Sequence, residues 1–370
     1  MTDDYKIGIE EEYFLVDATT KSVARQMPPG FLEAAKAATG GQIGGEFLQS
    51  QIEAKTLPHT DIKTARTELR HLRQTVAKIA AEHGHAILAA GTHPTADWGK
   101  SQQTEGLRYD AVMDDLQMIG RRNMLCGLHV HVELPDPDER VDVMMRMLPY
   151  LPLFVALATS SPFWRSRPTG LKGYRLAAYD ELPRTGVPEL FRNKDEFDAY
   201  VAALVKAGVM QDSSYVWWSM RPSLHLPTLE LRAPDCPTLV DDSIAIAALY
   251  RSLARRLTRN PALNADMNVV TRAIVIENKW RAQRYGVHGT FVADSGAVPI
   301  TEILDQVIDE TSSDAAALGC LTEMQRCHTI AGAGTSADAQ LAVFEAHDKA
   351  EDRTRALQAV KDWLAVATLQ

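Results

Sequence analysis

Residues 8–13 place three consecutive glutamates inside an otherwise apolar stretch. Successive side chains of a β-strand point to opposite faces, so Glu10 and Glu12 would share one face and Glu11 would lie on the other. Two carboxylates on one face repel each other unless solvent or a cation screens them. The segment therefore predicts either a solvated charged run or part of a cation site. A solvated run is usually found in a helix or loop, whereas this one interrupts an apolar strand.

Residues 128–134 show the strictest strand alternation in the chain. His129, His131 and Glu133 would occupy one face, and four aliphatic residues the other. A water-facing sheet surface explains the alternation without any need for histidine. Imidazole and carboxylate groups are also metal ligands, so the segment is equally a candidate for metal binding.

Two further segments carry carboxylates. Glu230 and Arg232 would share a strand face, which a surface ion pair explains adequately. Glu46 and Glu53 are seven positions apart, so a regular strand would point them in opposite directions. Either a β-bulge lies between them or they belong to different elements, and the spacing does not decide between these alternatives.

Residues 278–286 contain three cations, Lys279, Arg281 and Arg284, together with a tryptophan and a tyrosine. Such a cluster suits a polyanion such as a triphosphate, but charges on a helix surface explain it equally well. The sequence contains no glycine-rich nucleotide loop, no nucleophile elbow of the serine hydrolases and no His-Glu-x-x-His zinc motif. The remaining candidates are mainly carboxylates, and hard oxygen ligands favour Mg²⁺ or Mn²⁺ over zinc.

The apolar pattern predicts strands early in the chain and helices late. The expected strands are residues 5–16, 86–90, 124–134 and 216–232, and the expected helices are residues 61–83, 139–159, 197–205 and 241–258. From residue 301 the chain is Ala-rich and helical, and we expect one long charged helix over residues 336–369. This distribution predicts an α+β fold on an antiparallel sheet, which tolerates one polar face. We expect one catalytic domain, with a sheet-based core over residues 1–300 and a helical tail over residues 301–370.

Composition disfavours several classes of protein. The net charge of −9 and pI of about 5.7 provide no basic field for nucleic acid or anionic lipid. The N-terminus lacks the features of a signal peptide, and the longest apolar run, residues 148–160, is interrupted by two prolines. The four cysteines form no Cys-x-x-Cys pair and are expected to be buried thiols. We therefore expect a cytoplasmic protein that binds neither nucleic acid nor membrane.

Six segments occur in a distinctive order. They are Gly8-Ile9-Glu10-Glu11-Glu12-Tyr13, the pair Glu46 and Glu53, Ala90-Gly91-Thr92-His93-Pro94, Gly127-Leu128-His129-Val130-His131, Arg221-Pro222 with Thr228-Leu229-Glu230-Leu231-Arg232, and Asn278-Lys279-Trp280-Arg281 with Arg284-Tyr285-Gly286. Each segment alone is weak evidence. Together, over about residues 5 to 290, the chain resembles the glutamate–cysteine ligase type 2 family of bacterial carboxylate–amine ligases.

The resemblance implies a fold similar to the catalytic domain of glutamine synthetase, in which a curved antiparallel sheet presents its concave face to ATP, metal and amino acid. By resemblance, six residues are expected to bind Mg²⁺ or Mn²⁺: Glu10, Glu12, Glu46, Glu53, His129 and Glu230. Catalytic roles are expected for Glu230 and for Arg232, which would contact the acyl phosphate or the transferred phosphoryl group. The resemblance implies ATP contacts for Lys279, Arg281 and Arg284, and Arg175 as a clamp for the substrate carboxylate.

The implied activity is ATP-dependent amide formation between small amino acid substrates through an acyl phosphate, including glutamate–cysteine ligation. A metal-dependent hydrolase is the alternative, since the same carboxylates could activate water without ATP. An inactive binding protein would not need the metal ligands, yet all six positions carry suitable residues. The C-terminal helix could pack on the core or on a second subunit, and we expect a homodimer.

Overall fold

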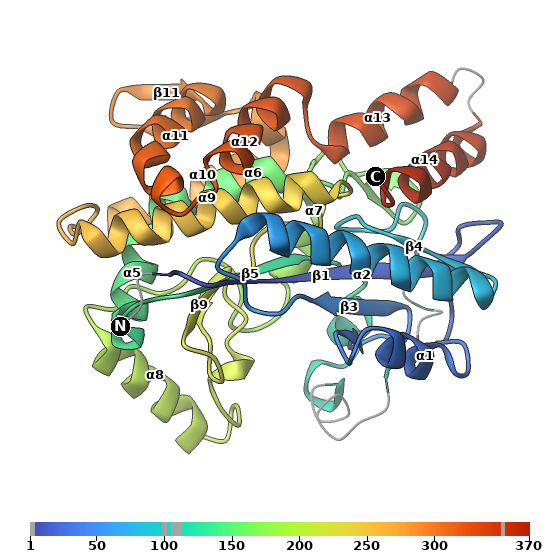
Figure 1. The fold of residues 1–370 in the computed structure, drawn as a ribbon, viewed down its shortest axis with the longest axis horizontal. Coiled ribbons are helices and arrows are strands. Elements are labelled where there is room, and N and C mark those ends of the chain that lie inside the picture. The colour runs from blue at the N-terminus through green and yellow to red at the C-terminus, as the bar shows by residue number, and fades with distance from the viewer. Residues whose placement is uncertain (1–3, 98, 100–101, 105–112, 349–351) are drawn as a thin grey trace.

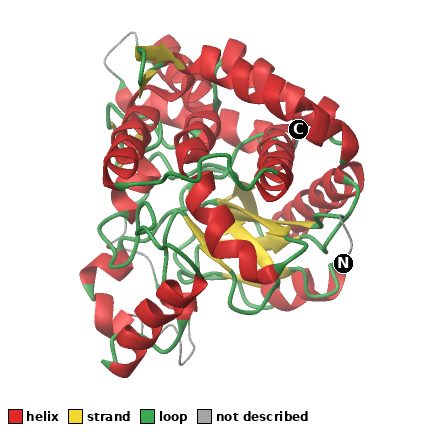
Figure 2. Cartoon of the chain, turned by 90° about the vertical axis from the view of Figure 1, so that its left-hand side faces the viewer, coloured by secondary structure: helices red, strands yellow, loops and turns green. Residues whose placement is uncertain are grey.

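The structure is a computed structural model that describes residues 4–97, 99, 102–104, 113–348 and 352–370. Long helices lie over one side of a twisted antiparallel sheet, and further helices form a second layer above them (Figure 1). Turned by a quarter, the molecule shows the same strands surrounded by helices and loops (Figure 2). The predicted α+β fold on an antiparallel sheet is confirmed.

The main sheet is built around its longest strand, β1. This strand pairs with β3 along one edge and with β5 and then β4 along the other, and the strand order is β2-β3-β1-β5-β9-β8. The strands of this sheet are β1 (Ile7–Asp17), β2 (Ile43–Gly45), β3 (Gln51–Lys55), β4 (His85–Leu88), β5 (Leu128–Glu133), β8 (Met220–Pro222) and β9 (Thr228–Leu231). Two small hairpins lie apart from it, β6 (Phe163–Trp164) with β7 (Arg167–Pro168) and β10 (Thr290–Ala293) with β11 (Gly296–Pro299).

The helices follow the apolar periodicity closely. They are α1 (Phe31–Ala38), α2 (Ile62–Glu82), α4 (Met118–Arg121), α5 (Arg140–Met147), α6 (Leu151–Ala158), α7 (Tyr174–Tyr179), α8 (Lys194–Lys206), α9 (Val240–Arg259), α10 (Val269–Tyr285), α11 (Ile300–Ala317), α12 (Leu321–Ala333), α13 (Ser336–His347) and α14 (Arg353–Ala367). Helix α2 begins after Asp61, whose side chain accepts a hydrogen bond from the Lys63 amide, and ends before Gly84 at φ +71°. Its predicted bounds are therefore confirmed.

The C-terminal helix departs from the prediction. Residues 336–369 form two helices, α13 and α14, that pack against each other, so the expectation of one long helix was wrong. Phe344 of α13 and Leu357 and Leu364 of α14 are buried in the same apolar cluster, which a single straight helix could not achieve. The helix predicted over residues 139–159 is divided, because a 3-10 turn at Leu148–Tyr150, which contains a proline, separates α5 from α6.

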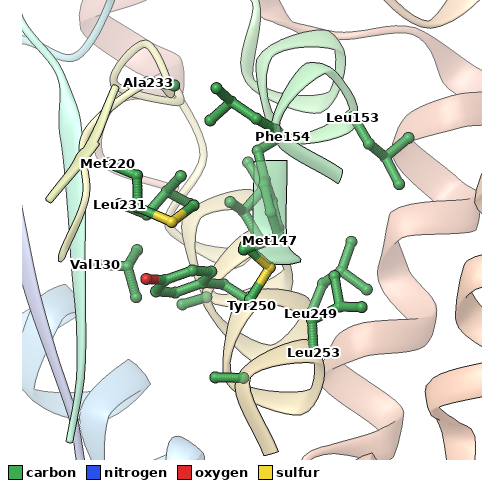
Figure 3. Close-up of a cluster of buried hydrophobic side chains, with 14 of the residues drawn as sticks. Val130, Met147, Leu153, Phe154, Met220, Leu231, Ala233, Leu249, Tyr250 and Leu253 are labelled. Atoms are coloured by element: carbon green, nitrogen blue, oxygen red, sulfur yellow. The ribbon is translucent and has the colours of Figure 1, made fainter. Parts of the chain in front are cut away.

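The apolar core fills the space between the sheet and the helices. Val130 of β5 and Leu231 of β9 face Tyr250 of α9, with Met147 and Phe154 on its other side (Figure 3). All five side chains are fully buried. The Tyr250 hydroxyl has no hydrogen-bond partner within the described part of the chain. Large apolar side chains thus pack against the helix-covered face of the sheet. Burial of the Tyr250 hydroxyl without a hydrogen bond lowers the free energy of unfolding.

All four cysteines are free and buried, as predicted. The stretch Pro137–Ala158 is long and apolar enough to cross a membrane, but 83% of its apolar window is buried inside the protein. The stretch, which includes α5 and α6, therefore belongs to the core of the protein.

Candidate active site

The sheet face that points away from α2 and α9 carries a cavity of about 520 Å³. Glu11 marks the helix-covered face, because it bonds to Arg73 of α2 and Ser243 of α9. Glu10 and Glu12 line the cavity on the opposite face, so the predicted alternation of β1 is confirmed. The lining includes eight of the residues singled out in the sequence: Glu10, Glu12, Glu46, Glu53, His129, Arg175, Glu230 and Arg232.

Strand register brings four of these side chains together. Glu10 of β1 lies directly opposite His129 of β5, and Glu12 lies directly opposite Glu53 of β3. Directly opposed residues of antiparallel strands project to the same face with Cβ atoms about 4.5–5.5 Å apart. The cluster therefore follows from local alternation together with the pairing of three strands.

The structure resolves how Glu46 and Glu53 reach one site. Glu46 follows β2 and Glu53 lies within β3, so the two belong to different elements of a hairpin and no bulge is needed. Burial and the charge of Glu12 raise the pKa of Glu46 to about 7. Burial among other acids therefore favours the protonated form of this carboxyl, although the charge of Lys55 acts in the opposite direction.

His129 is the centre of the cluster. Two sets of side chains place one potential ligand atom each within 4.8 Å of one another, namely Glu10, His129 and Glu230, and Glu12, Glu53 and His129. Nδ1 of His129 lies 3.4 Å from a Glu10 oxygen, and Nε2 lies 3.8 Å from a Glu12 oxygen. Nε2 is buried and has no hydrogen-bond partner among the described residues.

Protonation of His129 follows from its surroundings. Burial and the charge of Arg232 lower its pKa to about 4, so the ring is neutral at pH 7. A neutral imidazole carries one N–H and one lone pair. If Nδ1–H donates to Glu10, the lone pair lies on Nε2 and points toward Glu12. A ligand nitrogen oriented by a carboxylate on its other side is the usual arrangement of a metal-binding histidine.

The other carboxylates differ in their affinity for protons. Burial raises the pKa of Glu12, and it raises that of Glu53 well above its ordinary value. Burial acts in the same direction on Glu10, but the hydrogen bond with His129 and the charge of His131 outweigh it and lower that pKa. A divalent cation would stabilise the charged form of all three and so release bound protons.

Glu230 is held by two guanidinium groups. Arg232 of the same strand region bonds to one of its oxygens, and Nε of Arg221 lies 2.7 Å from the other. In spite of burial, the charges of Arg232 and Arg221 hold the pKa of Glu230 well below its ordinary value. Glu230 also lies directly opposite His131, so this corner of the cavity joins β5, β8 and β9.

Arg175 lies beneath a glycine at the cavity wall. Its Nη1 contacts the carbonyl oxygens of residues 232–234 at 3.2–3.4 Å, and its buried Nε has no partner in the described chain. A Cβ atom at Gly127 would lie 2.1 Å from Nη2 of Arg175. Only glycine at position 127 leaves room for this guanidinium in its present position. The Nε–H of Arg175 therefore stays available as a donor near Glu12.

The three cations of the 278–286 segment lie outside the lining of the cavity. Lys279 of α10 bonds to Asp180, which follows the lining residue Tyr179. Arg281 donates to the carbonyl and hydroxyl oxygens of Thr290, and Arg284 lies over the ring of Tyr285. Their contact with a nucleotide stays a prediction.

Sequence reasoning assigned no role to the lining residues Lys55 and Arg221, and it considered His131 only as part of a candidate metal-binding strand face. Lys55 bonds to Glu53 at 2.6 Å and lies opposite Glu10 in the sheet. Each of the three shares a sheet face with an acid, which lies either two positions away on the same strand or directly opposite on the neighbouring strand. Strand alternation was therefore the signal that could have placed them in the cavity. Pairing between strands, which alternation does not specify, decides their partners.

Comparisons with known proteins identify the family of the chain. Residues 6–359 match the model of a family described as glutamate–cysteine ligase family 2. A protein of Bradyrhizobium sp. (strain ORS 278) named "Putative glutamate--cysteine ligase 2" is 56% identical over 366 residues, covering 99% of this chain and 88% of the relative. A protein of the same name from Rhodospirillum rubrum is 42% identical over 373 residues, with coverage of 99% and 96%.

Solved structures share the fold at low sequence identity. A glutamate–cysteine ligase from Francisella tularensis, in complex with AMP, aligns with a TM-score of 0.68 and 14% identity over 97% of this chain and 89% of that one. A bifunctional glutathione synthetase from Pasteurella multocida aligns with a TM-score of 0.71 and 14% identity, and this chain spans 53% of its length. At such identity the likeness concerns the fold alone. On the family match and the identity to its relatives, the chain belongs to glutamate–cysteine ligase family 2.

Proposed function

We propose that the protein is an ATP-dependent carboxylate–amine ligase and that the carboxylate–histidine cavity is its active site. The observation that carries the proposal is the unpartnered Nε2 of His129, which lies among Glu12 and Glu53 in a chain of this family. Relatives bear the name of glutamate–cysteine ligase, so glutamate and cysteine are the first substrates to test.

The residues fit a divalent metal ion. Glu12, Glu53 and Nε2 of His129 would hold it, Glu10 would orient the imidazole, and Glu46 lines the same cavity. Oxygen-rich ligands of this kind suit Mg²⁺ or Mn²⁺. A bound Mg²⁺ would neutralise the negative charge on the phosphoryl oxygens of ATP.

The chemistry requires little from protein nucleophiles. A carboxylate oxygen attacks the γ-phosphorus of ATP, the bond to ADP breaks, and an acyl phosphate forms. The amine then attacks the acyl carbon, and inorganic phosphate leaves as the amide forms. Arg232, held in place by Glu230, would stabilise the phosphoryl charge, and the free Nε donor of Arg175 would orient the substrate carboxylate.

The proposed nucleotide contacts of Lys279, Arg281 and Arg284 require either a particular position of the nucleotide or movement of these side chains. Each now bonds or stacks outside the cavity lining. A nucleotide would therefore have to extend past Tyr179 toward α10, or these side chains would have to exchange their present partners. Loss of ATP affinity in Arg281→Ala, without loss of Mn²⁺ binding, would support a nucleotide contact for Arg281 in either arrangement.

A panel of amino acids tests the proposed function. Each pair is incubated with the protein, ATP and Mg²⁺, and ADP and phosphate are measured with and without chelator. We expect release that depends on both an amino acid carboxylate and the metal. ATP left intact by every pair, together with hydrolysis of amide substrates, would instead support the hydrolase alternative.

Cytoplasmic location and a homodimeric state are further proposals. Light scattering during size-exclusion chromatography decides the second. A mass of about twice the 40.8 kDa chain is expected, and a mass of one chain would contradict it.

A further inference from the structure

We propose that Lys55 is a built-in competitor for the metal ion, which keeps free divalent cations from binding tightly at the carboxylate cluster. The inference rests on the proposed function and concerns a residue that lines the same cavity. Nζ of Lys55 lies 2.6 Å from an oxygen of Glu53 and 3.6 Å from one of Glu10. Its positive charge therefore lies beside Glu53, a proposed metal ligand, and beside Glu10, the acid that would orient the ligand His129.

Strand geometry places the ammonium group there. Lys55 is the last residue of β3, two positions after Glu53, so both side chains point into the cavity. In the neighbouring strand it lies directly opposite Glu10. One lysine thus contacts acids of both β3 and β1 beside the proposed metal ligands.

The other cations that line the cavity near the cluster have different partners. Arg221 and Arg232 both bond to Glu230, and Arg175 contacts backbone carbonyl oxygens. Lys55 is consequently the cation that bonds to Glu53. Its side chain is 49% exposed, whereas that of Glu53 is 8% exposed. The lysine can therefore swing into solvent while the carboxylate stays in place.

Competition follows from charge. A divalent ion bound to Glu53 repels an ammonium group at the same carboxylate, so Lys55 must withdraw when the metal binds. The lost ion pair opposes binding of the free metal. A nucleotide that brings phosphate oxygens would supply replacement partners for the ammonium and ligands for the metal. The arrangement therefore favours entry of metal and nucleotide together.

Binding of Mn²⁺ alone tests the inference without any turnover. The concentration of unbound Mn²⁺ is measured by electron paramagnetic resonance in titrations of wild type, Lys55→Met, Lys55→Arg and the control Lys6→Met. Lys6 pairs with Glu133 at 3.3 Å and is similarly exposed, at 39%, but it does not line the cavity. We expect Lys55→Met to bind Mn²⁺ at least ~10-fold more tightly, and both other variants to stay within ~2-fold of wild type.

Thermal unfolding provides the second readout. In chelator, Lys55→Met should unfold at a lower temperature than wild type because the acids lose their counter-ion, and saturating Mn²⁺ should remove the difference. Unchanged or weaker Mn²⁺ affinity in Lys55→Met would overturn the inference and leave the proposed metal site standing. A deficit that persists equally with Mn²⁺ would assign Lys55 a purely structural role. No Mn²⁺ binding by either wild type or Lys55→Met would overturn both proposals.

Discussion

Substitution of Glu11 by glutamine separates the structural face of β1 from its functional face. Glu11 is fully buried and accepts hydrogen bonds from Nε and Nη2 of Arg73, both at 2.7 Å, from Tyr13 and from Ser243. Arg73 is itself 1% exposed and also donates to the carbonyl oxygen of Thr368 near the C-terminus. The ion pair thus joins the central strand, α2, α9 and the end of the chain.

The expected cost is large. Glutamine keeps the shape but removes the charge, and its amide nitrogen would face donors where an oxygen now accepts. Removing one partner of a buried ion pair typically costs about 3–5 kcal/mol, because the remaining charge stays buried without compensation. Against a usual total of about 5–15 kcal/mol, Glu11→Gln should lose a major part of the free energy of unfolding.

Urea unfolding of the metal-free protein measures this cost, with Glu12→Gln as the matched control. The two residues are adjacent on β1, but burial raises the pKa of Glu12, so removal of that charge should cost less than ~1 kcal/mol. Mn²⁺ binding should show the reverse order, with a strong loss in Glu12→Gln and little change in folded Glu11→Gln. A loss below ~1 kcal/mol in Glu11→Gln would refute the reasoning.

Three other variants test separate parts of the structure. Burial lowers the pKa of His93 to about 3, so only the unfolded state takes up its proton as the pH falls below about 6.5. The free energy of unfolding lost between pH 7.5 and 5 should accordingly be about 2 kcal/mol smaller in His93→Gln, and an equal loss would contradict this. Tyr250→Phe removes an unpartnered buried hydroxyl and should raise the free energy of unfolding in urea by about 1 kcal/mol, whereas destabilisation would show that the hydroxyl is satisfied. Gly127→Ala should displace Arg175 and raise the KM for the carboxylate substrate at least ~10-fold in steady-state assays, and an unchanged KM would remove Arg175 from that role.

Strand alternation explains why part of the cavity was predictable. The faces of Glu10, Glu12 and His129 depend only on a period of two residues, which is a local property. The apolar residues around them identified the strands themselves. These predictions therefore required no knowledge of which strands are neighbours.

Other features depend on contacts between distant residues. The bonds of Lys55 to Glu53 and of Arg221 to Glu230 require side-chain conformations within a specific sheet register. Glu46 reaches the site because a hairpin folds β2 against β3, and seven intervening positions do not specify a hairpin. The C-terminal helix was predicted too long because the apolar spacing of α13 continues in α14, whereas the structure divides the segment into two helices that bury residues in one cluster.

The transfer of oxygen from carboxylate to phosphate tests the central claim most directly. Glutamate labelled with oxygen-18 in its side-chain carboxylate is incubated with cysteine, ATP, Mg²⁺ and the protein, and the products are analysed by mass spectrometry. The acyl-phosphate mechanism predicts ADP together with one labelled oxygen in inorganic phosphate. Label in AMP with release of pyrophosphate, or ATP that stays intact with every amino acid pair, would contradict the proposed ligase.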